Sequence, residues 1–437
     1  MADAGFNIWW GLVGLIPLLL YIFLVMREMD PLPATVICVV LGAIINAKSL
    51  IAVGVDLSKA LGSFLGLVGL IIMLGRGLGE VLSETKVAHT LVYKIIYGIG
   101  VNTQKKALAG IMMATMVIVG LLGTMAGGVA IIAPIVNPIA AAVGLTPAAV
   151  AVLYQSVGEE ALTLGPFTPP VVTLLGLTKL DYGTMLVTAA LPIAIVTLLV
   201  TWFMVQRIQR STQEKTTSGI VVGKEIETFQ PTTYSRRATN TFIILFSLLI
   251  AYGIYMKAAT PFVITVMLGL SFVVGMVGGM KFENVCKSIV KGMAGNVGLF
   301  LLFILLELFI QYVETAGGFK ALTYMMMPLI NIGGKTAVVI AGGAIGAFGI
   351  SGAVVAELVT LNKMFATLLV EYKVSMIAWA VALIVATRVT NFVIPGSNMV
   401  AMMGFAQSNN LKAMLRNGYA VALAQITLLV LYALAFR

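Results

Sequence analysis

The amino-acid sequence predicts an all-α polytopic membrane protein made of two inverted-topology repeats with broken helices. Of the 437 residues, 60% are hydrophobic and only 10% are charged, and a water-soluble domain cannot bury that much apolar surface. Apolar stretches of spanning length recur along the whole chain. Two of them are interrupted by glycine and proline at corresponding places in the two halves of the chain, as in membrane proteins built from inverted repeats.

The apolar stretches fall into two sets separated by a polar segment. A helix needs about 20 apolar residues to cross a bilayer, so we expect about ten to twelve crossings, some of them broken. The first set comprises residues 9–26, 35–55, 61–81, a stretch from 108 onward and 184–205. The second comprises residues 241–255, 261–280, 297–310, a stretch from 336 onward and 419–436.

The net charge of +10 comes from Lys and Arg in loops between spans. Such loops favour the cytoplasmic side, so we expect a multi-pass protein of the cytoplasmic membrane with its N-terminus outside, and no nucleic-acid partner. The N-terminal segment lacks the basic region of a cleavable signal, so the first helix should be retained. Cys38 and Cys286 lie in or beside spans and do not indicate a disulfide framework.

The basic segment 206–240 divides the chain. We interpret it as a cytoplasmic linker between a first repeat, 1–205, and a second repeat, 241–437, whose spans run in the opposite direction. Segment 120–130 (GLLGTMAGGVA) resembles segment 346–356 (GAFGISGAVVA), and the broken segment 157–180 resembles 386–411. The low identity leaves the register open by one or two residues. Placing Gly176 on Gly404 aligns Glu160 with Arg388, Thr163 with Asn391 and Thr168 with Gly396.

Prolines 166, 169 and 170 interrupt the first broken segment. They cannot donate backbone hydrogen bonds, so a helix should end near Leu164 and a new one should begin near Pro169 with Thr168 as its N-cap. In the second segment Pro395 interrupts the helix, and Ser397 or Asn398 should cap the next one. Free N–H groups at two such helix starts would bind an anionic group. The alternative is a pair of packing kinks without a ligand.

Glu159 and Glu160 precede the first break among apolar residues. A carboxylate inside the membrane exchanges protons or binds Na⁺; the alternative is a hydrated turn. Arg388 lies in an equally apolar stretch and needs a carboxylate partner, from substrate or from the protein. We expect Glu160 and Arg388 to face one cavity that binds a zwitterion, or else to form a permanent structural ion pair. The expected substrate-binding set is Glu159, Glu160, Thr163, Thr168, Arg388, Asn391, Ser397 and Asn398.

A second set of polar residues accompanies the glycine clusters. Small residues there let backbone carbonyls coordinate a cation, or simply let helices pack closely. The expected cation-coupling residues are Asn137, Glu160, Ser351 and Glu357, with Na⁺ held at Glu160 or Asn137.

The sequence contains no HExxH, GxSxG or Walker A motif, and His89 is the only histidine. We therefore expect no enzyme and no cofactor beyond a coupling ion, Na⁺ or H⁺. A channel would require a filter-like run or a ring of acidic residues, which we do not find. A structural membrane scaffold is a further alternative, which the charges at the two breaks argue against.

The motif GEEALTLGPFTPP, the glycine clusters and the segment VIPGSN together resemble the Na⁺/H⁺ antiporter (NhaC-like) family of the ion transporter superfamily, in the branch of amino-acid permeases, histidine permeases included. The resemblance implies a homodimer with a re-entrant hairpin and a broken helix in each repeat, and elevator-like movement. In the dicarboxylate branch, a Ser-Asn-Thr triplet at each hairpin tip binds carboxylate and Na⁺. Here Ser397 and Asn398 match but Met399 replaces the threonine, and Thr168, Pro169 and Pro170 stand at the first tip, which argues against a dicarboxylate.

These observations predict a secondary active transporter that couples a Na⁺ or H⁺ gradient to symport or antiport of a small organic ion, with an amino acid as the expected substrate. The alternative is a Na⁺/H⁺ antiporter without an organic substrate, in which Arg388 is structural. The expected partners are the substrate and the lipid bilayer.

Overall fold

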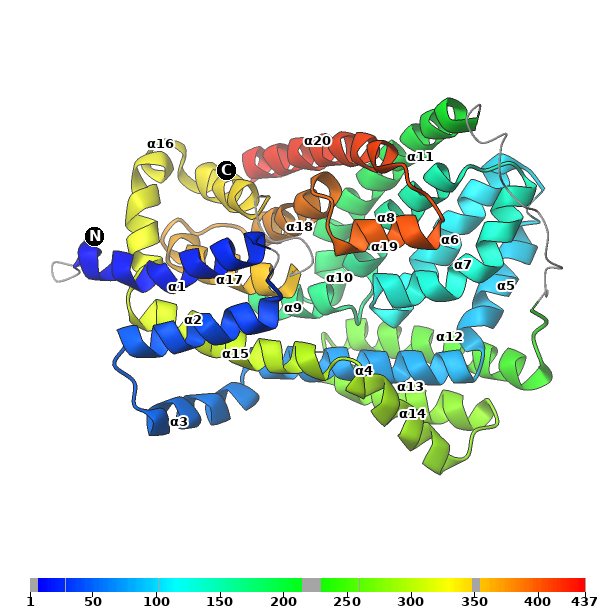
Figure 1. Ribbon diagram of the computed structural model, residues 1–437, viewed down its shortest axis with the longest axis horizontal. Helices are drawn as coiled ribbons and strands as arrows, with labels where there is room; N and C mark the ends of the chain where they lie inside the picture. Colours follow the sequence, from blue (N-terminus) through cyan, green and yellow to red (C-terminus); the bar gives the residue numbers. More distant parts are fainter. Residues whose placement is uncertain are drawn as a thin grey trace.

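The protein is an all-α, multi-pass membrane protein in the computed structural model (Figure 1). The structure describes residues 7–436 except 28, 101, 214–228, 259 and 348–353. Within these residues, 10 helices are long and apolar enough to cross a membrane. The described helices are α1 (Ile8–Met26), α2 (Pro31–Ile45), α3 (Leu50–Leu61), α4 (Phe64–Glu84), α5 (Val87–Ile99), α6 (Gln104–Leu122), α7 (Met125–Ala142), α8 (Pro147–Leu164), α9 (Pro169–Thr178), α10 (Tyr182–Met185), the π-turn η1 (Leu186–Ala190), α11 (Leu191–Gln213), α12 (Thr233–Tyr255), α13 (Phe262–Val277), α14 (Phe282–Ala294), α15 (Val297–Thr315), α16 (Gly318–Gly346), α17 (Val354–Glu371), α18 (Met376–Val393), α19 (Ser397–Phe405) and α20 (Leu411–Ala435).

The predicted span 35–55 is wrong, because the chain leaves the helix after Ile45. Ala47 has a left-handed conformation (φ 49°), and the polar residues around it end α2. The following helix, α3, is separate and carries Asp56, whose carboxylate accepts a 3.0 Å bond from the Lys48 ammonium. Charged residues at this spacing favour a helix with one polar face over continuation of a span.

Helix α16 is bent, and the bend separates two apolar segments. Its parts Gly318–Pro328 and Ile330–Gly346 meet at 119°. Pro328 lies at the end of the first part, and Gly334 has a non-helical conformation (φ 55°) that glycine adopts without steric cost. The stretch that the sequence predicted from residue 336 onward therefore belongs to a helix that begins earlier and changes direction.

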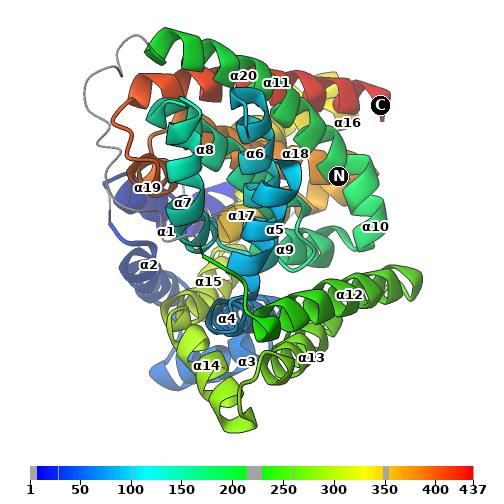
Figure 2. The ribbon, with the colours of Figure 1, turned by 90° about the vertical axis from the view of Figure 1, so that its right-hand side faces the viewer.

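The two repeats show reciprocal packing, as expected for inverted topology. Helix α8 contacts α6, α7, α11 and α19, whereas its counterpart α18 contacts α16, α17, α20 and α9. Each helix before a break thus packs against the helix that follows the other break. Figure 2 shows α11 and α20 side by side, and α12 beside α13. The repeat boundaries 1–205 and 241–437 stay a prediction; α11 runs on to Gln213 and α12 begins at Thr233.

The first glycine cluster forms the turn of a helical hairpin. Helices α6 and α7 pack together and are joined through Gly123 (φ 65°) and Thr124. A Cβ atom at Gly123 would lie 3.5 Å from Pro169 and 3.7 Å from Thr168, so the hairpin turn packs directly on the first break. Helices α8 and α9 together form one candidate span, Pro147–Thr178, so the expectation that Thr168–Pro170 is a hairpin tip is wrong. The segment between α16 and α17 includes residues 348–353, which lie outside the described part.

Candidate functional site

The first break lies where the sequence predicts it. Helix α8 ends at Leu164, and α9 begins at Pro169 with Thr168 in the extended N-cap conformation (φ −72°, ψ 148°). The Thr168 hydroxyl does not cap the new helix; it donates instead to the carbonyls of Leu162 (2.6 Å) and Gly165 (2.9 Å). The Gly165 carbonyl also accepts from the Thr168 backbone N–H at 3.2 Å. The buried Thr168 therefore supplies donors to carbonyls at the end of α8, where the helix has no further N–H groups to offer.

The second break is open rather than buried. Helix α18 ends at Val393, and Gly396 is the N-cap of α19 with no side-chain capping bond, so the prediction that Ser397 or Asn398 caps this helix is wrong. Ser397 is exposed and Asn398 half-buried. The two helix starts are not equivalent anion sites either, because Pro169 and Pro170 supply no N–H in the first turn of α9.

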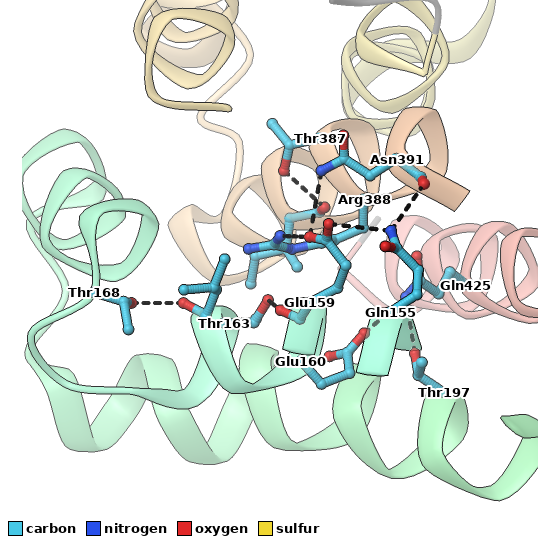
Figure 3. Close-up of polar contacts among 12 residues, drawn as sticks. Gln155, Glu159, Glu160, Thr163, Thr168, Thr197, Thr387, Arg388, Asn391 and Gln425 are labelled. Carbon is cyan, nitrogen blue, oxygen red and sulfur yellow. Dashed lines mark hydrogen bonds and ion pairs between the residues drawn. The ribbon is translucent and has the colours of Figure 1, made fainter. Parts of the chain in front are cut away.

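Arg388 of α18 forms a buried ion pair with Glu159 of α8 (Figure 3). The guanidinium is 2% exposed and the carboxylate 0%. The same Glu159 Oε2 accepts a 3.3 Å bond from the Asn391 amide, and Oε1 accepts a 3.4 Å bond from Gln155 Nε2. Gln155 also donates to the Asn391 backbone carbonyl at 3.2 Å. Polar side chains from both α8 and α18 therefore surround one carboxylate.

The partner of Arg388 differs by one residue from the one that the sequence alignment suggested. The sequence alignment paired Arg388 with Glu160, but in the structure the partner is Glu159. Glu159 lies as far along the chain from Pro147, the first residue of α8, as Arg388 lies from Met376, the first residue of α18. Counted from the helix starts, it is Glu159 and not Glu160 that corresponds to Arg388.

Glu160 points away from this ion pair, toward α11 and α20 (Figure 3). Its Oε1 accepts a 3.1 Å bond from Gln425 Nε2, which also donates to the Thr197 hydroxyl at 2.8 Å. All three residues are 0% exposed, and Glu160 Oε2 has no hydrogen-bond partner in the part of the chain that the structure describes. Adjacent residues on a helix point about 100° apart, so the two glutamates belong to two separate polar groups.

The remaining expected residues have varied surroundings. The Thr163 hydroxyl donates to the Glu159 backbone carbonyl at 3.1 Å and does not reach the ion pair. Asn137 accepts a 2.7 Å bond from the Tyr154 hydroxyl and donates one of 2.7 Å to the Phe405 carbonyl, so its side chain joins α7, α8 and α19 and is not an open ligand. Ser351 lies outside the described residues.

Glu357 of α17 comes close to the central site from the second hairpin. Arg388 interacts electrostatically with it, and its buried Oε1 has no hydrogen-bond partner among the described residues. The sequence reasoning missed Gln155, Thr197 and Gln425 because it considered charged residues and breaks. A usable signal existed for Gln155, which lies four residues before Glu159 and therefore on the same helical face.

A cavity of about 350 Å³ adjoins the first break. It lies between the end of α8 and helices α5, α6 and α12, and most of its lining is apolar; the lining includes Gly120, Gly165, Pro166, Phe242 and Phe246. Its position beside the break, and not at Arg388, separates it from the ion pair.

Comparisons with known proteins place this architecture among solved transporters. No family model matches the sequence, and no curated protein matches it. The crystal structure of the YdaH transporter of Alcanivorax borkumensis, described as having an unusual topology, superposes with a TM-score of 0.62 at 16% identity, over 88% of this chain and 89% of that one. MtrF of Neisseria gonorrhoeae, described as illuminating a class of antimetabolite efflux pumps, superposes with a TM-score of 0.52 at 15% identity, over 92% and 95%. The chain therefore has a fold found in membrane transporters.

Proposed function

We propose that the protein is a secondary active transporter that couples a H⁺ or Na⁺ gradient to the movement of a small organic ion, with an amino acid as the substrate class. The buried pair of Glu159 and Arg388 carries this proposal. An ion pair enclosed between two broken helices is costly in a membrane and typical of a transport pathway.

Arg388 is the group that would bind the substrate carboxylate. A guanidinium matches the geometry of a carboxylate, and the buried Nε of Arg388 has no hydrogen-bond partner within the described residues. A substrate carboxylate would displace Glu159 and complete the two-pronged contact that arginine favours. The released Glu159 carboxylate would then face the substrate ammonium, with Asn391 and Gln155 as further hydrogen-bond partners.

An organic substrate also agrees with the fold neighbour MtrF, described as belonging to a class of antimetabolite efflux pumps. Membership of the NhaC-like family, a homodimer, insertion in the cytoplasmic membrane and an outside N-terminus all belong to this proposal, on the sequence grounds given above. The cation-coupling roles of Glu160 and Glu357 rest on the full burial of Glu160, on the buried Oε1 of the half-buried Glu357, and on the electrostatic interaction of both with Arg388.

The second candidate is a Na⁺/H⁺ antiporter without an organic substrate. One observation favours it: Arg388 already has a carboxylate partner inside the protein, so it can be purely structural. The glutamates would then exchange protons for Na⁺.

Reconstituted proteoliposomes distinguish the two candidates. Labelled amino acids are offered under an imposed Na⁺ or pH gradient, and accumulation supports the first candidate. Proton movement driven by Na⁺ alone supports the second. In the first case Arg388→Lys should lower substrate affinity at least tenfold, about 1.4 kcal/mol, because lysine cannot make a two-pronged contact. Lys363→Arg, at an exposed ion pair of α17, is the matched control. Near-normal affinity in Arg388→Lys would remove Arg388 from the binding site.

A further inference from the structure

The neighbourhood of Arg388 contains more buried acid than base. Arg388 pairs with Glu159 and interacts electrostatically with Glu160 and Glu357. One guanidinium balances one carboxylate, so ionisation of all three glutamates would leave two uncompensated negative charges. An uncompensated charge in a low-dielectric interior is strongly disfavoured, and such sites take up protons or cations.

Two buried acceptor atoms around Glu160 are without donors. Among the described residues, neither Glu160 Oε2 nor Gln425 Oε1 has a hydrogen-bond partner, although both residues are 0% exposed. The two side chains are already joined by the 3.1 Å bond from Gln425 Nε2 to Glu160 Oε1. A buried acceptor without a donor is unfavourable, because it has lost its hydrogen bond to water and no protein hydrogen bond replaces it. One proton on Glu160 Oε2 supplies the missing donor, since a carboxylic acid and a primary amide each offer one donor and one acceptor to the other.

We propose that Glu160 is the residue that binds and releases the coupling proton, as a carboxylic acid hydrogen-bonded to Gln425. This inference rests on the proposed transport function and names its coupling site. The amide nitrogen of Gln425 directs its hydrogens at both Glu160 and Thr197. Sodium ions require oxygen ligands on all sides, so an amide N–H₂ group at this position favours a proton over Na⁺.

The proton also controls the central ion pair. With Glu160 neutral, the electrostatic pull on Arg388 comes from Glu159 and Glu357. When the proton leaves Oε2 for water, Glu160 becomes an anion that attracts Arg388 electrostatically, in competition with Glu159. Within the described residues, Arg388 and Glu159 are the charged groups that act on Glu160. Release of the proton therefore weakens the hold of Arg388 on Glu159.

Infrared difference spectroscopy of the purified full-length protein tests this assignment without a substrate. Spectra taken across a pH titration should contain a carboxylic-acid C=O band that Glu160→Gln removes and Glu357→Gln leaves in place. Glu314→Gln, at an exposed ion pair of α15, is the control for the same chemical change. Gln425→Leu should keep the band and shift it, because the acid loses its amide partner. This variant also keeps the test decisive where Glu160→Gln fails to fold.

Two results would overturn the assignment. One is an unchanged set of carboxylic-acid bands in correctly folded Glu160→Gln. The other is loss of the Glu160 band on adding Na⁺ at constant pH, which would make the site a sodium site. Neither result depends on the identity of the substrate. The proteoliposome experiment can therefore contradict amino-acid transport while the spectra still support the proton site at Glu160. Likewise, the spectra can contradict the proton site while amino-acid transport is observed.

Discussion

Glu159 and Arg388 occupy matched positions in the two repeats and pair with each other. Both α8 and α18 are 18-residue helices, and the two residues are equally far from the first residue of their own helix. When two halves are related by a pseudo-two-fold axis, a contact between equivalent positions lies close to that axis. Identical charged residues would repel each other there, so an arginine in one repeat and a glutamate in the other turn the same contact into an attraction.

The first prediction concerns the energy of this pair. Arg388→Met should lower the free energy of unfolding by about 3–5 kcal/mol, because it leaves Glu159 buried without its cation. Glu159→Gln should destabilise the protein for the reciprocal reason. The double variant should lose less free energy of unfolding than the two single variants lose together, since no uncompensated charge remains in it. This double-mutant cycle is measured from the melting temperatures, in detergent, of the wild type, both single variants and the double variant. Additive losses would show that the two side chains do not interact.

The second prediction concerns the contact between α18 and α20. A Cβ atom added at Gly418 would overlap the Phe392 backbone carbonyl, next to the Asn417 amide that donates a 2.7 Å bond to Ser156. Gly418→Ala should therefore lower stability by about 1–3 kcal/mol through overpacking. Gly404→Ala on α19 is the matched control, because nothing lies within 4 Å of its added Cβ. Equal melting temperatures for both variants would contradict the packing shown here.

The third prediction concerns Asp181, which lies between two predicted spans and caps α10. Its Oδ1 accepts from the Thr184 N–H at 2.9 Å and its Oδ2 from the Thr184 hydroxyl at 2.6 Å. The Thr184 hydroxyl, followed by the Thr184 backbone N–H, lowers the pKa of Asp181 below its usual range. A lowered pKa in the folded state means that the ionised carboxylate stabilises the fold above the ordinary aspartate pKa of about 3.9, and that this is lost as the pH falls through the folded-state pKa.

Asp181→Ala should therefore cost about 1 kcal/mol of stability at neutral pH. The difference from wild type should shrink in acid, where the wild-type carboxylate is protonated as well. Asp181→Asn keeps an N-cap oxygen without a titratable charge. Its stability at neutral pH should therefore be close to that of the wild type and should not show this pH dependence. Chemical unfolding of the three proteins in detergent at neutral and acidic pH measures both effects. If the difference in stability between the alanine variant and the wild type were the same at neutral and acidic pH, the capping argument would be refuted.

Local signals in the sequence located the first break and the membrane class. Prolines 166, 169 and 170 fix where α8 ends and α9 begins because they cannot donate to a helix on either side. The same reasoning failed at the cap of α19, where Gly396 and not Ser397 precedes the helix. A one-residue difference in a cap costs little energy, so sequence patterns resolve it poorly.

The contacts between distant helices could not be inferred from the sequence. Glu159 and Glu160 are neighbours in an apolar run, and either could have been the partner of Arg388, which lies in the other half of the chain. Which of the two faces α18 depends on the rotation of α8 about its axis. That rotation is set by the packing of α8 against α6, α11 and α19, and no local pattern in α8 encodes it.

The sequence by itself determined that this chain crosses a membrane many times, where its first broken helix ends and restarts, and that charged residues precede both breaks. It could do so because hydropathy and proline chemistry act over a few neighbouring residues. Only the tertiary structure decided that Arg388 binds Glu159, that Glu160 belongs with Gln425 and Thr197, and that the glycine cluster of the first repeat packs on its break. These relationships depend on how helices far apart in the chain rotate and approach one another, and that is fixed by the packing of the whole molecule.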